Sequence, residues 1–151
     1  MRLTPLVVLV GVLGCGEKYS DSLQPLAETA WTERVGGLKC DHQMTFYTDG
    51  KYLEAKICTL PDYSQRAEVS KGTFHVNGPT LTVALNESTC AVDRSGSVDF
   101  AYNGDTLTLY PSEGLITLVR TAFTPGEPQA LPLGCFDLET WEFTAGDLHS
   151  I

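Results

Sequence analysis

The sequence is poor in basic residues, and this scarcity excludes whole classes of partner. Ten Lys and Arg residues stand against 19 Asp and Glu residues, which gives a formal net charge of −9 at pH 7. Because no stretch gathers the basic residues, binding to nucleic acid or direct attraction to anionic lipid headgroups is disfavoured. Cationic partners are compatible with this charge, although a surplus of carboxylates also serves simply to keep a surface soluble.

Motifs of catalysis and metal binding are equally scarce. The chain has no Gly-rich phosphate loop, no His-Glu-x-x-His, no nucleophile elbow and no Cys-x-x-Cys. His42, His75 and His149 are the only imidazoles, and the local sequence places no nucleophile beside them. We therefore expect a protein that is not an enzyme and that has no cofactor. A cavity holding His42 or His75 beside an acidic residue would revive an enzymatic role.

Two short stretches suggest metal ligands but fit them poorly. Cys40-Asp41-His42 has no second ligand pair at the spacing of a zinc finger. The stretch 93–99 has oxygen-bearing side chains at alternate positions, but its glycine is fourth rather than sixth and the closing glutamate is missing. A solvated hairpin loop is the better interpretation, and no metal site is expected.

Long hydrophobic runs are absent as well. The apolar run from Leu6 to Leu13 is far shorter than the ~20 residues that a spanning helix needs, and it suits the core of an export signal. Val12-Leu13-Gly14-Cys15 resembles the lipobox of bacterial lipoproteins. The resemblance implies that residues 1–14 are a signal peptide, and that Cys15 receives a diacylglyceryl group on its sulfur and an acyl chain, such as palmitate, on its new amino end. An ordinary cleaved signal peptide is the alternative.

Several acyl chains on one residue give stable membrane anchoring. In well-studied sorting systems an aspartate after the cysteine favours the inner membrane, whereas Gly16 stands here. The resemblance therefore implies an outer-membrane lipoprotein facing the periplasm or the cell surface. Residues 15–25 are polar after the cysteine and are expected to form a tether, and removing Arg2 with the signal takes the net charge from −9 to −10.

The rest of the chain is suited to a single β-domain, because 151 residues with 42% hydrophobic residues can bury one core. Asn77-Gly78 and Asn103-Gly104, flanked by alternating apolar residues, predict tight hairpin turns. A third hairpin is predicted about Asp49-Gly50. The pattern predicts eight strands, at 26–35, 40–48, 51–59, 67–76, 80–85, 97–102, 105–110 and 115–123.

Alternation along these strands predicts which side chains point into the core. From residue 72 onward the predicted inward set is Phe74, Val76, Leu81, Val83, Leu85, Val98, Phe100, Tyr102, Leu107 and Leu109. A two-residue turn at Asp49-Gly50 pairs residues whose numbers sum to 99. This register places Cys40, His42, Met44, Phe46, Leu53, Ala55 and Ile57 on one face, and Asp41, Gln43, Thr45, Glu54 and Lys56 on the other.

Eight consecutive antiparallel strands remove their edges by closing, which predicts an all-β, up-and-down barrel over residues 26–123. An early Trp31, the hairpin Phe46 to Tyr52, the strand Gly72 to Phe74 and a late Arg120 resemble the small lipocalin-like domains of secreted bacterial lipoproteins. The resemblance implies a calycin-like topology. Either side chains fill such an interior or it holds one small ligand, and the candidate lining residues are Trp31, Phe46, Phe74, Tyr102 and Arg120.

Four cysteines remain after Cys15, and an even number in an oxidising compartment predicts two disulfides. The turns lie at one end of the predicted sheet, so Cys40, Cys58 and Cys90 lie near the other. We favour Cys40 with Cys58 and Cys90 with Cys135, and the two other pairings stay open. In the predicted register Cys40 and Cys58 face opposite ways, so their pairing requires a one-residue bulge.

Residues 124–151 are expected to form a Pro-rich linker that cannot pair as a strand, followed by a tail docked on the barrel. Leu138 to Trp141 suits a short helix and Trp141 to Phe143 suits a strand. The sequence thus predicts a lipid-anchored, non-enzymatic protein that binds a small or apolar ligand or another envelope component. The alternative is an inhibitor or interaction module for a cationic enzyme such as a lysozyme.

Overall fold

The computed structural model describes residues 26–35, 40–90, 95–123, 131–137, 139–140 and 142–151. These residues form an all-β domain, and none of them belongs to a helix long and apolar enough to cross a membrane. Eight strands form the barrel: β1 (Thr29–Val35), β2 (Cys40–Phe46), β3 (Lys51–Thr59), β4 (Gln65–Asn77), β5 (Thr80–Ser88), β6 (Gly96–Tyr102), β7 (Thr106–Tyr110) and β8 (Ile116–Thr121).

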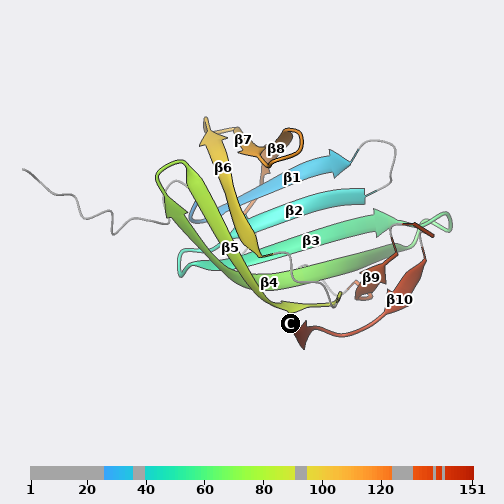
Figure 1. Cartoon of the computed structure of the whole chain (residues 1–151). Helices are drawn as coiled ribbons and strands as arrows, with labels where there is room; N and C mark the ends of the chain where they lie inside the picture. Colours follow the sequence, from blue (N-terminus) through green and yellow to red (C-terminus); the bar gives the residue numbers. More distant parts are fainter. Residues whose placement is uncertain (1–25, 36–39, 91–94, 124–130, 138, 141) are drawn as a thin grey trace, which may run out of the picture.

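The eight strands close into an antiparallel up-and-down barrel, as the alternation predicts (Figure 1). Each strand pairs with its neighbours in sequence, including β5 with β6, and β1 pairs with β8, which closes the barrel. The predicted strand ends are close to the observed ones, except that β1 begins only at Thr29 and β5 continues to Ser88. Leu26, which precedes β1 in a turn, is fully buried in the barrel.

The core confirms the inward set predicted from residue 72 onward. Six of its members are buried and the other four are partly buried against the same cluster. The cluster also contains Leu26, Trp31, Met44, Phe46, Tyr52 and Leu118. Burying side chains of this size, at 1.5–3 kcal/mol each by rough transfer values, is the main driving force for closing the barrel.

One end of the barrel is closed by packed side chains. The Trp31 indole is fully buried, meets Tyr102 edge to face at 5.7 Å between ring centroids, and donates a hydrogen bond from Nε1 to Thr29 Oγ1 at 2.7 Å. The Arg120 guanidinium lies over the indole at 5.9 Å and donates to the Gly104 carbonyl at 3.2 Å. Side chains thus cover this end of the barrel.

The register of β2 and β3 differs by one residue from the predicted one. Phe46 pairs with Tyr52 and Cys40 with Cys58, so the paired numbers sum to 98. The turn has three loop residues, 48–50, and the Gly50 amide donates to the Tyr47 carbonyl at 3.1 Å while Gly50 takes φ 79°. This is the geometry of a type I turn followed by a left-handed residue, which favours glycine.

The corrected register exchanges the faces of β3. The side chains of Leu53, Ala55 and Ile57, predicted to be inward, lie in a cluster on the outer face, and Glu54 shares the inner face with His42, Met44 and Phe46. The prediction was wrong because a two-residue turn was assumed at Asp49-Gly50. The correction removes the need for a bulge, since Cys40 and Cys58 now lie directly opposite each other and form a disulfide.

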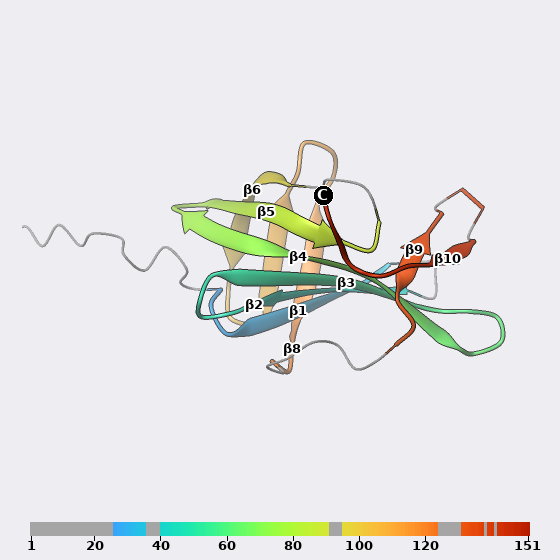
Figure 2. The ribbon, with the colours of Figure 1, turned by 90° about the horizontal axis from the view of Figure 1, so that it is seen from below.

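Leucines of the C-terminal segment cover the outer face of β3 and β4, and Phe136 and Phe143 pack with the disulfide of Cys40 and Cys58. Strands β9 (Gly134–Phe136) and β10 (Phe143–Ala145) form a small second sheet beside β4, and β11 (His149–Ser150) pairs with the end of β5 (Figures 1 and 2). Leu131, Leu133 and Leu148 pack on the outer cluster Leu53, Ala55, Ala67 and Val69. The predicted docking of the tail is thereby confirmed for the described residues.

The expectation that the linker cannot pair was wrong at its end. The Ala67 amide donates to the Pro132 carbonyl at 3.1 Å, and Leu133 forms a parallel bridge with Ala67. Proline lacks a donor but keeps its acceptor, so it can take part at an edge. The disulfide between Cys90 and Cys135 links this segment to the end of β5. Leu138 and Trp141 lie outside the described residues.

Candidate functional site

A cavity of about 220 Å³ lies inside the barrel where β5 and β6 separate. We call it the inner cavity. The last residue pair between these strands is Val83 with Gly96, and both residues line the cavity. Its apolar wall is formed by Met44, Leu81, Val83, Val98 and Leu109, and the other lining residues are Gly96, Ser97, Tyr52 and Glu54. An apolar wall with a few convergent polar groups is the usual composition of a small-molecule site.

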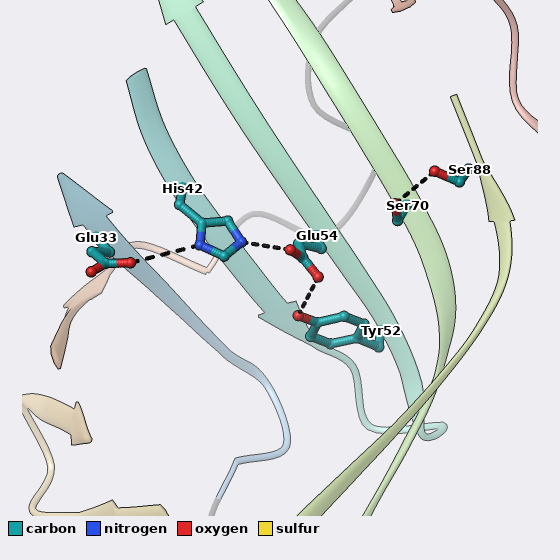
Figure 3. A network of polar contacts seen from close by, with 6 residues as sticks. All are labelled: Glu33, His42, Tyr52, Glu54, Ser70 and Ser88. Atoms are coloured by element: carbon teal, nitrogen blue, oxygen red, sulfur yellow. Dashed lines mark hydrogen bonds and ion pairs between the residues drawn. The ribbon is translucent and has the colours of Figure 1, made fainter. Parts of the chain in front are cut away.

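A chain of polar contacts runs from the inner cavity across the inner face of β3, β2 and β1 (Figure 3). We call Glu33, His42, Tyr52 and Glu54 the His42 network. Glu54 Oε1 lies 2.7 Å from His42 Nε2, and the Tyr52 hydroxyl donates to Glu54 Oε2 at 3.2 Å. On the other side of the ring, His42 Nδ1 lies 3.8 Å from Glu33 Oε2. The imidazole thus lies between two carboxylates.

The register explains how these side chains meet. Glu33 and His42 are direct partners across β1 and β2, so their side chains share the inner face. Glu54 is paired with Met44, one diagonal step from His42, and diagonal neighbours of this kind are within reach of long side chains. Tyr52 and Glu54 are two residues apart on β3 and therefore lie on the same face.

Burial and charge act against each other at His42. Burial by itself would lower the pKa of the His42 imidazole, but the hydrogen bond and the charge of Glu54, helped by the charge of Glu33, outweigh it and raise that pKa. Burial, followed by the charge of Glu54, also raises the pKa of Tyr52 well above its ordinary value. Tyr52 therefore stays a neutral hydroxyl that donates to Glu54 at physiological pH.

The network does not have the geometry of a metal site. A metal ion needs ligand atoms that converge on one point, whereas the two carboxylates approach opposite nitrogens of the His42 ring. Elsewhere in the described part of the chain, ligand atoms of Glu68, Cys90 and Cys135 do converge. Both sulfurs there belong to a disulfide, and Glu68 accepts a hydrogen bond from the Phe136 amide at 3.2 Å.

The arrangement does include an imidazole beside a carboxylate, which was our condition for considering an enzyme. However, both ring nitrogens of His42 contact carboxylates rather than a hydroxyl or a thiol. Ser70 and Ser88 hydrogen-bond to each other across β4 and β5 at 2.9 Å, apart from His42 (Figure 3).

The five residues predicted to line a cavity are in the packed part of the barrel or at its closed end. Phe46 and Phe74 are buried and meet each other at 4.9 Å between ring centroids, while Trp31, Tyr102 and Arg120 form the closed end. None of the five lines the inner cavity. The assumed register turned Glu54 outward, so its contact with His42 was not predicted, and Glu33 and Tyr52 were not predicted as site residues either.

The remaining predicted sites have different outcomes. The favoured pairings Cys40 with Cys58 and Cys90 with Cys135 are confirmed. Cys15 lies outside the described residues, so its lipidation stays a prediction. In the stretch 93–99, residues 93 and 94 are outside as well. Of the others, Ser95 Oγ accepts from the Leu85 amide at 2.7 Å and Asp99 accepts from Thr80 at 2.8 Å, as expected for a hairpin loop.

A larger groove of about 550 Å³ lies on the outer surface, near the turn of β2 and β3 and the bulge in β4. Its lining includes both acidic and basic side chains, among them Asp49 and Lys51, which form an exposed ion pair at 3.0 Å. Exposed pairs of this kind contribute little energy. We regard the smaller inner cavity as the better candidate because buried polar groups converge there.

Three comparisons, with protein-family models, curated proteins and solved structures, find no match for this chain.

Proposed function

We propose that this chain is a non-enzymatic lipoprotein of the bacterial cell envelope, anchored through acylated Cys15, that binds a small ligand in the inner cavity of its lipocalin-like barrel. The observation that carries the proposal is the cavity itself, lined by residues of several strands and bordered by Tyr52 and Glu54. The lipobox-like stretch 12–15 and the two disulfides support an exported location.

The size of the cavity limits the ligand. A volume of about 220 Å³ is below the roughly 300–1,000 Å³ of sites for drug-sized molecules. The neighbouring interior is occupied by Phe46, Phe74 and Leu81, each no more than 4% exposed. A long acyl chain therefore does not fit, and the ligand class narrows from a general apolar molecule to a small one with a polar group.

Native mass spectrometry of the protein purified from its producing cells tests the proposal. We expect a small molecule to be retained by the wild type and lost when Val83→Phe fills the cavity. Val119→Phe is the matched control, because Val119 is 57% exposed on β8 and lies away from the cavity lining. If the wild type retains no molecule and cell extract moves no NMR signal of Val83 or Val98, the ligand-binding proposal is wrong.

Radiolabelled palmitate tests the anchor separately. We expect label in the wild type and none in Cys15→Ser, because acylation of the new amino end follows lipidation of that thiol. Equal labelling of both proteins would contradict the lipoprotein assignment.

The second candidate is an interaction module for a cationic enzyme such as a lysozyme. The observation that favours it is the net charge of −9 together with two carboxylates, Glu33 and Glu54, on one side of the barrel interior. An electrostatic complex weakens as salt is added. A pull-down of lysozyme that persists unchanged from low to high salt would contradict this candidate.

A further inference from the structure

We infer that the inner cavity selects small organic cations, with the ammonium or guanidinium group against Glu54 and the alkyl part against the apolar wall. The inference rests on the proposed ligand-binding function and names the class of ligand. It starts from the His42 network, which borders the cavity through Tyr52 and Glu54.

The charges of the network do not balance. Two carboxylates, Glu33 and Glu54, face one imidazole, so even a protonated His42 neutralises only one of them. Lys56 lies opposite His42, with its ammonium 5.5 Å from the centre of the Phe136 ring, and Arg120 lies over Trp31 at the closed end. Among the described residues that line the inner cavity, Glu54 is the one charged group, so the cavity presents a carboxylate without a basic residue beside it in the wall.

The Glu54 carboxylate is held in place as well as charged. His42 Nε2 is 2.7 Å from one oxygen and the Tyr52 hydroxyl is 3.2 Å from the other, and the Glu54 side chain is only 20% exposed. A fixed carboxylate in partly dry surroundings attracts a cation more strongly than one in bulk water. The same field repels anions, which distinguishes this cavity from a site for fatty acids.

The cavity wall adds a second requirement. Leu81 and Leu109 are buried, and with Met44, Val83 and Val98 they offer a short apolar surface opposite the polar end. A ligand that satisfies both parts has one cationic head and a few methylene or methyl groups. A free amine has this chemistry, and so does a lysine side chain of a partner protein.

Binding of three small probes with four carbon atoms each tests the inference: n-butylammonium, n-butanol and n-butyrate. Methyl signals of Met44, Val83 and Val98 in NMR spectra of the purified full protein report the site and give dissociation constants. We expect butylammonium to bind at least tenfold tighter than butanol, and butyrate to bind more weakly than either.

Glu54→Gln keeps the shape of the side chain and removes its charge, so butylammonium should lose at least fivefold in affinity while butanol is unchanged. Glu113→Gln removes the same charge from an exposed loop and should change neither. Competition by a lysozyme for the same methyl signals would assign the ammonium group to a partner's lysine. Absence of competition would assign it to a free amine.

The pH dependence adds an independent test. The groups that face His42 are Glu33 from β1 and Glu54, Tyr52 and Lys56 from β3. Protonation of His42 adds a positive charge beside Glu54, so affinity for butylammonium should fall as pH is lowered through the raised pKa of His42. His42→Gln should abolish this step.

The outcomes separate the inference from the function on which it rests. Equal affinities for butylammonium and butanol would overturn the selection of cations and leave ligand binding intact. A loss of butylammonium binding in Glu113→Gln as large as in Glu54→Gln would overturn it too, since a general charge effect would then suffice. If none of the three probes binds and no natural molecule is retained, both proposals are wrong.

Discussion

The two ends of the β2–β3 ladder are built from different kinds of contact. At the turn, Phe46 and Tyr52 are a direct pair with ring centroids 5.2 Å apart, and Phe46 also meets Phe74. Four pairs further along, His42 lies opposite Lys56, and the ladder ends at the disulfide between Cys40 and Cys58, which packs against Phe136. Apolar packing thus holds one end, while hydrogen bonds, charges and a covalent bond add to the packing at the other.

The difference shows how one sheet can combine a stable core with a site. Packing is strong where side chains are apolar and large, and it leaves no space. Polar side chains on the inner face interrupt that packing, and the inner cavity lies at the point where the interruption begins, beside Met44, Tyr52 and Glu54. The disulfide adds a covalent link at the other end of the ladder, where Cys40 and Cys58 pack against Phe136. Three predictions test this contrast.

The largest effect is expected at the packed end. Phe46→Ala removes a fully buried ring, and we expect the free energy of unfolding to fall by about 3–5 kcal/mol, the usual range for Phe to Ala in a core. Denaturant unfolding followed by fluorescence measures it. Leu115→Ala, at a site 61% exposed, is the control and should change stability by no more than about 0.5 kcal/mol. A loss below about 1 kcal/mol at Phe46 would contradict the packing assigned to this end.

The next effect is expected at the covalent end. Replacing Cys40 and Cys58 together by Ala should lower the free energy of unfolding by about 3 kcal/mol, because their 18-residue separation closes a loop of moderate length in the unfolded chain. The pKa of His42, followed by NMR, should stay raised in the double variant if the ladder keeps its register. A variant as stable as the wild type would show that hydrogen bonds alone hold this end.

The smallest effect is expected in the middle, where His42 makes stability depend on pH. Because folding raises the pKa of His42 above its ordinary 6.5, its contribution is fully present below that value and is lost as pH rises through the higher folded pKa. Unfolding measured from pH 5 to pH 9 should show this decline. His42→Gln should remove it, whereas His75→Gln, at an exposed position on β4, should leave it unchanged. A decline of equal size in all three proteins would assign it to other groups.

The contact between His42 and Glu54 was not predicted from the sequence because one turn was assigned the wrong length. Asp49-Gly50 has the residues of a two-residue turn, but the same residues also suit a three-residue loop that ends in a left-handed glycine. The two choices differ by one residue in register and turn Glu54 to opposite faces. The cysteines contained the missing signal, because a direct pair of Cys40 with Cys58 requires the register that is observed.

The sequence by itself determined the all-β class, the eight strands and the inward positions from Phe74 to Leu109, because alternation and turn residues act over a few neighbouring positions. It also indicated the two disulfides. Only the tertiary structure decided the register of β2 and β3, the closed end at Trp31 and the meeting of Glu33, His42, Tyr52 and Glu54. These features depend on closing the barrel, which brings together side chains from separate strands. No local sequence pattern encodes which of those side chains then meet.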